Sequence, residues 1–302
     1  MIHISCGFDS GAIEVLRCER ADDIRLRLRA DNAADFRQWF HFRVSGAKDQ
    51  KLRMVFENAG EAAYADGWPG YRCVASHDRR HWFRIAATRY ENGELIVEHQ
   101  PTHDDVHYAY FEPYSHERHL DLIATAAASP LARVRRLGGT VDGRDLDAVV
   151  VGSHQTGRPP LWIIARQHPG ETMAEWFIEG LLERLLDAAD PVARRLREQA
   201  QLCIVPNMNP DGAVRGNLRT NAAGRNLNRE WRTPDALASP EVFAVRAAME
   251  ASGCGLFLDI HGDEALPFVF FARPDEVPGY LEGAGAAQAA FIAAFAAASP
   301  DF

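Results

Sequence analysis

The chain has 302 residues, of which 47% are hydrophobic and 25% are charged, as is typical of a folded globular protein. Its formal net charge of −9 argues against nucleic acid as a partner bound through bulk electrostatics. Apolar runs such as Leu161–Ala165 are far too short to cross a bilayer, so we expect no membrane partner.

Cysteine usage and the N-terminal sequence favour a cytoplasmic location. The five cysteines are scattered and form no CxxC pair, which fits free thiols in a reducing compartment better than a disulfide framework. The N-terminal stretch MIHISCGFDSGAIEV has no basic segment followed by a long apolar run, so we expect no signal peptide. The sequence does not indicate an oligomeric state.

Residues 1–125 contain many short segments with alternating apolar and polar side chains, separated by turn signals such as Asn92-Gly93. This pattern predicts an N-terminal antiparallel β-sandwich domain. The predicted strands are Ile24–Leu28, Trp39–Val44, His81–Ile85 and Glu94–Glu98. An alanine-rich helix predicted at Leu120–Ala128 leads to Ser129-Pro130, and we expect the domain boundary there, at about residue 125.

Residues 126–302 show a different pattern, in which continuous apolar runs alternate with helical periodicity. Strand–helix–strand alternation predicts a mixed, largely parallel sheet in an α/β/α domain. The predicted strands are Leu146–Val151, Leu161–Ala165, Gln201–Val205, Gly255–Ile260 and Phe268–Ala272, and the predicted helices are Met173–Leu186, Pro240–Ala251 and Gly283–Ala298.

Polar clusters follow the ends of several predicted strands, where sites form in open α/β sheets. His168 and Glu171 lie three residues apart after one strand, and His261 follows another. Two imidazoles and one carboxylate are a donor set for catalytic zinc, which needs three protein ligands and an open position for water. Asp259 is expected beside them, where it could orient an imidazole.

The motifs HPGET, NPDG, NLNREW and DIHGDE resemble, in order and spacing, those of the M14 zinc carboxypeptidases. They are most similar to the cytosolic carboxypeptidase branch, which also has an N-terminal β-sandwich, and YAYFEPYS resembles its interdomain signature. The resemblance implies that His168, Glu171 and His261 bind one zinc ion. It also implies that Arg219 stabilises an oxyanion, and that Asn228 and Arg229 hold the C-terminal carboxylate of a peptide or protein substrate.

In this branch the relatives act on C-terminal or branch-point glutamates, so acidic residues are the first candidates for removal. Arg225 would suit an acidic side chain, and Arg215 is a further basic residue of the same segment. One feature departs from the family. Its general-base glutamate and a substrate-closing tyrosine follow well after the third zinc ligand, and Glu276, Glu282 and Tyr280 come too early to match them. We assign no general base, and we expect the sequence to be part of a longer protein.

Two other functions stay open at this point. One is a zinc amidase or deacylase of the aspartoacylase type, against which the long N-terminal sandwich argues. The other is a non-catalytic protein that binds C-termini and lacks the base. The histidine pairs His77/His81 and His103/His107 echo a metalloprotease spacing, but they lie outside predicted helices and are not expected to bind zinc. Asn209–Gly212 is interpreted as a structural turn.

Overall fold

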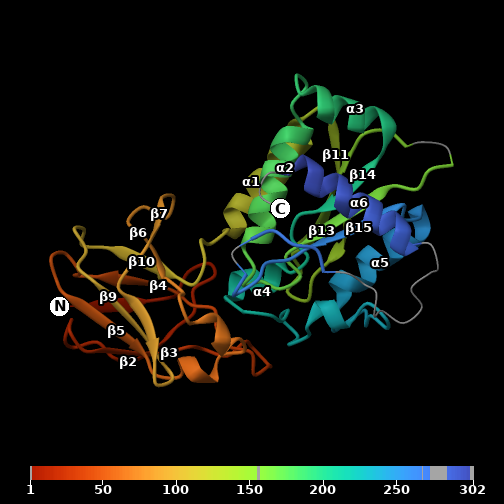
Figure 1. Cartoon of the computed structure of the whole chain (residues 1–302). Helices are drawn as coiled ribbons and strands as arrows, with labels where there is room; N and C mark the ends of the chain where they lie inside the picture. Colours follow the sequence, from red (N-terminus) through yellow and green to blue (C-terminus); the bar gives the residue numbers. More distant parts are fainter. Residues whose placement is uncertain (1, 155–156, 267, 273–283, 300–302) are drawn as a thin grey trace. The chain divides into compact units, whose positions relative to one another are not determined.

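The computed structural model describes residues 2–154, 157–266, 268–272 and 284–299. The chain forms two compact units, Met1–Gly262 and Asp263–Phe302 (Figure 1). Three five-stranded sheets belong to the first unit. None of the helices in the described ranges combines the length and the apolar character that crossing a membrane requires.

Two sheets build the predicted N-terminal sandwich. Every strand pair in them is antiparallel except β3 with β5. In spatial order, the first contains β1 (His3–Ser5), β4 (His41–Ser45), β10 (Val106–Ala109), β6 (Val74–Ser76) and β7 (Trp82–Arg84). The second contains β2 (Glu14–Arg17), β3 (Ile24–Arg27), β5 (Leu52–Phe56), β9 (Glu94–His99) and β8 (Thr88–Glu91), and the short helices η1 (Ala59–Glu61) and η2 (Ala65–Gly67) follow β5.

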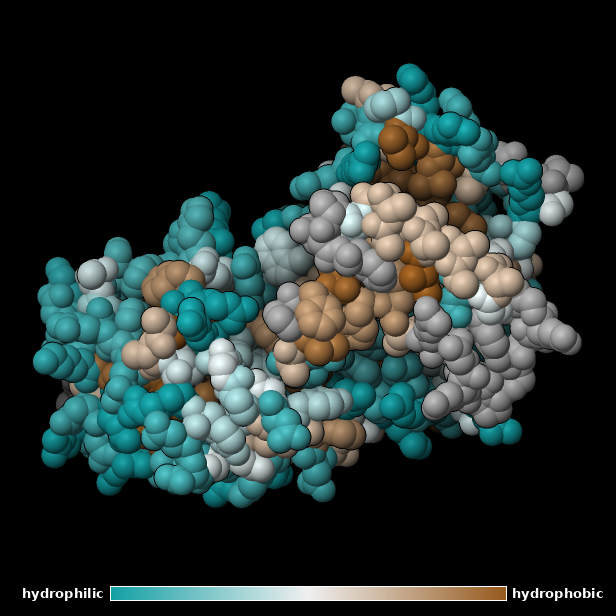
Figure 2. Space-filling model, in the orientation of Figure 1, coloured by the Kyte–Doolittle hydropathy of each residue, from teal (hydrophilic) through white to brown (hydrophobic). Residues whose placement is uncertain are grey.

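The sandwich core follows from the alternation seen in the sequence. In β3 the side chains of Ile24 and Leu26 are buried, and in β10 those of Val106 and Tyr108 are buried against them in one apolar cluster. Because alternate side chains of a strand point to opposite faces, each sheet places one apolar face in the core. Figure 2 shows the outer surface of the sandwich in this view as mostly hydrophilic.

The third sheet has the order β11 (Ala132–Gly139), β12 (Asp145–Val151), β14 (Leu202–Val205), β13 (Leu161–Ala165) and β15 (Leu256–Ile260). It is mixed, as predicted: β13 is parallel to β14 and β15, whereas β12 is antiparallel to β14 and β11. The parallel part is the part that carries the predicted ligands, because β13 and β15 end side by side at Ala165 and Ile260.

Helices cover both faces of this sheet. One apolar cluster joins Val149, Val151 and Ile163 to α1 (His116–Ala128), α2 (Met173–Leu185) and α3 (Pro191–Gln199). On the other face, Val150 and Trp162 pack with η3 (Leu227–Arg229) and α5 (Pro240–Ser252). The short helix α4 (Pro210–Arg215) starts at Asn209, whose side chain accepts a hydrogen bond from the Gly212 N–H, so the NPDG stretch has the predicted structural role.

The predicted domain boundary at about residue 125 falls inside α1, where Ala126 packs on the third sheet. The division into residues 1–125 and 126–302 stays a prediction.

The second unit is described by itself. It contains α6 (Ala284–Ala298), which confirms the predicted helix apart from Gly283, outside the described residues. The strand predicted at Phe268–Ala272 is wrong: the residues described there form no strand. Their aromatic side chains account for the apolar pattern in another way. The Phe271 ring packs edge-on against Phe291 and Phe295 of α6, with centroid distances of 5.8 and 5.1 Å.

Candidate metal centre

The turn after β13 carries two of the predicted ligands and is fixed by a buried arginine. Arg166 has a left-handed backbone conformation, with φ of 57°, and its side chain is buried. Its guanidinium donates to Glu175 Oε2 at 2.6 Å, to the Tyr114 carbonyl at 2.9 Å and to the Pro169 carbonyl at 3.1 Å. These hydrogen bonds hold the turn that carries His168 and Glu171.

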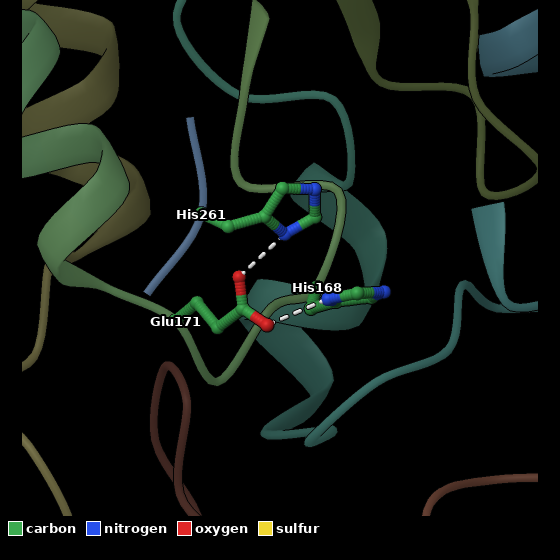
Figure 3. A group of neighbouring side chains, drawn as sticks. All are labelled: His168, Glu171 and His261. Carbon is green, nitrogen blue, oxygen red and sulfur yellow. Dashed lines mark hydrogen bonds and ion pairs between the residues drawn. The ribbon is translucent and has the colours of Figure 1, made fainter. Parts of the chain in front are cut away.

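The structure brings His168, Glu171 and His261 together (Figure 3). One ligand atom from each side chain lies within 4.8 Å of the others. His168 Nδ1 is 2.6 Å from Glu171 Oε1, and His261 Nδ1 is 2.8 Å from Glu171 Oε2. The side chains of His168 and Glu171 are buried, whereas 27% of the His261 side chain is exposed, so the group is open to solvent on the His261 side.

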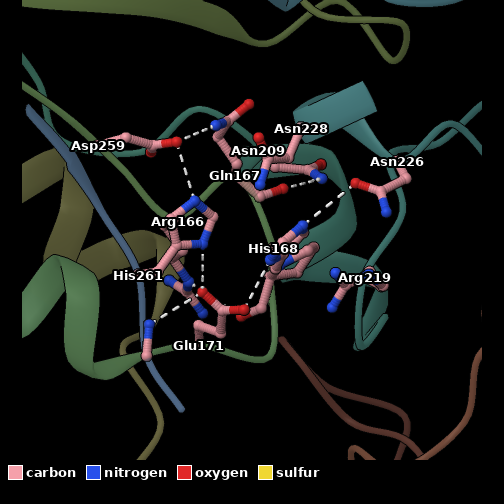
Figure 4. Close-up of polar contacts among 12 residues, drawn as sticks. Arg166, Gln167, His168, Glu171, Asn209, Arg219, Asn226, Asn228, Asp259 and His261 are labelled. Atoms are coloured by element: carbon pink, nitrogen blue, oxygen red, sulfur yellow. Dashed lines mark hydrogen bonds and ion pairs between the residues drawn. The ribbon is translucent and has the colours of Figure 1, made fainter. Parts of the chain in front are cut away.

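Each imidazole is held at its other nitrogen by a side-chain oxygen. His168 Nε2 is 3.1 Å from Asn226 Oδ1, and His261 Nε2 is 2.9 Å from Asp259 Oδ2 (Figure 4). An oxygen at Nε2 favours the tautomer that carries its proton there and leaves Nδ1 free to bind a metal. Both histidines therefore present the same nitrogen to the shared carboxylate.

Asp259 is held in turn by a second layer of hydrogen bonds. The Gln167 amide donates to Asp259 Oδ2 at 2.5 Å, and the Trp231 indole N–H donates to Gln167 Oε1 at 2.8 Å. The hydrogen bond from Trp231 orients the Gln167 side chain so that its NH₂ group faces the Asp259 carboxylate. Asp259 thus lies beside the site, as the sequence predicts, and its Oδ2 contacts both His261 and Gln167.

The charges of the group are coupled. Burial opposes a charged Glu171, but its hydrogen bonds with His168 and His261 and their charges lower the pKa of the carboxyl to about 2. Burial also opposes a charged His261, yet hydrogen bonds and charges from Asp259 and Glu171 raise its pKa to about 10. Without metal, the site therefore holds a carboxylate and an imidazolium at neutral pH, and a divalent cation would replace the proton of His261.

The donor set fits zinc. Two imidazole nitrogens and one carboxylate oxygen are ligands that zinc accepts, and the oxygens at both Nε2 positions are the outer partners that zinc-binding histidines require. The described residues contain no second group of three possible ligands. In particular, His81 is exposed and bonds to Asp78, and the His77 ring stacks on His103 at 4.0 Å.

The predicted substrate-binding residues lie on the segment between α4 and α5. Arg219 is half-buried, and its guanidinium contacts the Tyr64 hydroxyl. Asn228 is half-buried in η3, which begins directly after Asn226. Arg229 is exposed, and its guanidinium donates to the Asn228 carbonyl at 3.2 Å. Figure 4 draws Arg219 and Asn228 with the three predicted ligands. Glu276, Tyr280 and Glu282 lie outside the described residues.

Four residues of the site were not predicted from the sequence: Arg166, Gln167, Glu175 and Asn226. Gln167 directly precedes the HPGET stretch and Asn226 is the first residue of NLNREW, so their neighbours in the sequence were a usable signal. The pairing of Arg166 with Glu175 depends on how α2 leaves the turn, which no spacing in the sequence specifies.

Comparison with known proteins agrees with this geometry. The cytosolic carboxypeptidase N-terminal domain family matches residues 4–111, and the zinc carboxypeptidase family, peptidase M14, matches residues 117–280. Among curated proteins, one from Zymomonas mobilis is 48% identical over 92% of this chain and 72% of its own length. Human cytosolic carboxypeptidase 4 is 33% identical over 87% of this chain, which spans only 28% of that longer protein.

Solved structures extend the similarity to the whole fold. The metallo-carboxypeptidase from Burkholderia cenocepacia is 52% identical, with a TM-score of 0.97, and the match covers 100% of this chain and 81% of that one. The metallo-carboxypeptidase from Pseudomonas aeruginosa, in complex with (2-guanidinoethylmercapto)succinic acid, is 46% identical, with a TM-score of 0.91 and coverage of 96% and 77%. The chain therefore belongs to the zinc carboxypeptidases of peptidase family M14, a family of hydrolases, in the cytosolic carboxypeptidase branch.

Proposed function

We propose that this protein is a zinc-dependent metallocarboxypeptidase that hydrolyses the C-terminal peptide bond of peptides or protein tails. The observation that carries the proposal is the group of His168, Glu171 and His261, with both imidazoles oriented at Nε2. We propose that these three residues bind one zinc ion per chain. Zinc bound there would supply Lewis acidity and lower the pKa of a water.

The chain's own residues would position the substrate. A guanidinium fork matches a carboxylate in shape and charge, so Arg229 with the Asn228 amide would hold the C-terminal carboxylate. Arg219 would stabilise the negative charge that develops on the carbonyl oxygen in the transition state. Their common origin in residues 219–229, which also supply Asn226 to His168, supports this division of roles.

We propose acidic C-terminal residues as the first substrates to test, and the cytoplasm as the location. Arg225 is exposed and adjoins Asn226, so its charge is available close to the site. The ligand of the Pseudomonas aeruginosa relative combines a succinic acid, which would mimic a C-terminal carboxylate, with a basic guanidino group. Because that ligand carries a guanidino group, the panel of substrates has to include basic side chains as well.

The test is release of C-terminal residues by zinc-loaded protein. Peptides ending in Glu, Asp, Lys, Phe or Leu, and an N-acyl amino acid, would be incubated with the wild type, His168→Ala and the matched surface variant His81→Ala. Stepwise shortening of the peptides, detected by mass spectrometry and lost only in His168→Ala, is the expected result. Cleavage of the acyl amino acid alone would indicate an aspartoacylase-type amidase. Stoichiometric zinc with no cleavage would indicate a binding protein.

A further inference from the structure

Several hydrogen bonds join the segment that carries Arg219 to the N-terminal sandwich, some of them from Asn32, and one buried carboxylate accepts four of them. Asp31 lies in the loop between β3 and β4 and is 6% exposed. Its Oδ1 accepts a hydrogen bond from the Leu218 N–H at 2.5 Å. Its Oδ2 accepts from the N–H groups of Arg219 and Thr220 and from Thr220 Oγ1, at 2.8, 2.8 and 2.9 Å. Three successive backbone N–H groups are thus fixed by one side chain of the other domain.

The contacts require a carboxylate rather than any polar side chain. All four partners of Asp31 are donors, so both of its oxygens must accept. Burial raises the pKa of Asp31 and opposes the charge, while these hydrogen bonds act in the opposite direction. An asparagine in its place would be nearly isosteric. It would turn an NH₂ group toward N–H groups or leave them without an acceptor, which is costly in a buried site.

The guanidinium of Arg219 is enclosed by the same domain. It lies over the rings of Phe36 and Tyr64, at 5.8 and 5.4 Å from their centroids, and donates to the Tyr64 hydroxyl. Phe36 belongs to the Asp31 loop, because the Asp31 N–H donates to its carbonyl at 2.7 Å. Both the backbone and the side chain of Arg219 are therefore placed by residues of the sandwich.

Leu218 connects this anchor to the turn that bears the predicted ligands. Its side chain is buried in the sandwich core, and its carbonyl accepts a hydrogen bond from the Gly170 N–H at 2.9 Å. A Cβ at position 170 would lie 3.0 Å from that carbonyl oxygen, a tight contact, so the close approach favours glycine. Asp31 thus contacts the Arg219 backbone directly, and through Leu218 it is linked by one further hydrogen bond to the His168–Glu171 turn.

We infer that Asp31 is a positioning residue for catalysis: it holds the Leu218–Thr220 backbone so that Arg219 faces the reacting carbonyl. The inference rests on the proposed carboxypeptidase function and assigns the N-terminal sandwich a part in it. A group that must meet charge in the transition state gains from a fixed orientation, because no reorganisation is then needed during the reaction. Loss of the anchor should lower kcat and leave KM nearly unchanged.

The experiment compares Asp31→Asn, Arg219→Ala and the double variant on one peptide substrate. Asp190→Asn is the matched control, because Asp190 also accepts backbone N–H groups, those of Val192 and Ala193, at the start of α3. We expect Arg219→Ala to lower kcat about 100- to 1,000-fold. Asp31→Asn should lower it about 10- to 100-fold, with zinc content unchanged, and Asp190→Asn should stay within about twofold of the wild type.

The double variant separates positioning from a general structural role. If Asp31 acts through Arg219, then Asp31→Asn causes no further loss of kcat in the Arg219→Ala background. Additive losses, loss of zinc, or an Asp31→Asn kcat equal to that of the wild type would overturn the inference while the proposed function stood. A wild type that cleaves no peptide would instead remove the proposed function, and the inference with it.

If Asp31→Asn does not fold, Thr220→Val provides a milder second test of the inference. It removes one donor to Asp31 and leaves the three backbone hydrogen bonds in place. The expected loss of kcat is then a few-fold, and it should also vanish in the Arg219→Ala background. A Thr220→Val effect that persists there would contradict the inference.

Discussion

At the scale of single residues, the two predicted histidine ligands differ in what holds them. His168 Nε2 faces the neutral amide oxygen of Asn226, whereas His261 Nε2 faces the Asp259 carboxylate. Hydrogen bonds to a charged acceptor are roughly twice as strong as those between neutral groups. His261 should therefore be the more basic ligand, and its orientation should depend more on its outer partner.

This difference predicts that removing Asp259 and removing Asn226 weaken zinc affinity to different extents. Asp259→Asn should weaken zinc affinity about 10- to 100-fold, and Asn226→Ala should weaken it less. Competition with a chromogenic chelator would measure both affinities. Asp145→Asn, which changes an exposed aspartate of β12, is the control. Equal losses for the two variants would contradict the asymmetry, and no loss for Asp259→Asn would show that the carboxylate does not hold a metal ligand.

The charge of His261 predicts proton release on metal binding. Its pKa is raised to about 10 in the metal-free protein, so at pH 7 the ring is protonated and must lose its proton to bind zinc. Apparent zinc affinity should therefore rise with pH, by up to about tenfold per unit for this one proton, until about pH 10. Calorimetry at pH 7 in buffers of different ionisation enthalpy would count the proton. No buffer dependence would rule out His261 as the protonated ligand.

The sequence predicts the three ligand residues of the site but not Asp31. His168 and Glu171 are separated by one short turn, and His261 follows a parallel strand, so strand-end reasoning brings them together. Asp31 could not be found in this way. It is one of many acidic residues, and its partners lie 187 to 189 positions away in the sequence.

At the scale of elements, α5 begins with a buried acid that carries a stability cost. Glu241 is fully buried in the first turn, where Oε2 accepts a hydrogen bond from the Asn221 amide at 3.1 Å. Its Oε1 has no hydrogen-bond partner among the described residues. Burial, with the nearby charge of Asp211, raises the pKa of Glu241 to about 7.

The raised pKa of Glu241 gives a stability prediction with a definite sign. Between pH 4.5 and about 7 the folded protein keeps a proton that the unfolded chain has lost, so the free energy of unfolding falls as pH rises. Glu241→Gln removes this titration, so its free energy of unfolding relative to the wild type should rise by roughly 2.5 kcal/mol between pH 5 and pH 8. Urea unfolding at both pH values measures this, with Glu250→Gln on the surface of α5 as control. The same difference at both pH values would contradict the assignment.

Elements with a strong period were predicted well, and short or irregular ones were not. The helices α2 and α5 and the strands β12 to β15 end within about two residues of their predicted bounds. The six-residue α4 has too few turns to show a helical period. The aromatic run at 268–272 has strand-like composition, but its Phe271 packs on a helix, and composition alone does not distinguish the two arrangements.

At the scale of the whole molecule, zinc binding should stabilise the folded state. The predicted ligands come from two strand ends, and Asp31 ties the sandwich to the segment beside them. An ion that binds only the folded state stabilises it, by about 2.7 kcal/mol at a hundredfold excess over Kd. Zinc should thus raise the midpoint of thermal unfolding of the wild type and leave that of His261→Ala unchanged, in a calorimetric scan with and without a chelator. An equal rise in both would place the ion elsewhere.

The central claim is that the protein removes residues from a free C-terminus with zinc. The most direct measurement compares a peptide that has a free C-terminal carboxylate with the same peptide amidated at its C-terminus. Mass spectrometry follows both peptides, each incubated with zinc-loaded protein and with protein from which a chelator has removed the zinc. We predict shortening of the free acid alone, only with zinc, and a raised KM in Arg229→Ala, because the carboxylate partner is lost. Equal cleavage of acid and amide, or cleavage that survives chelation, would contradict the assignment.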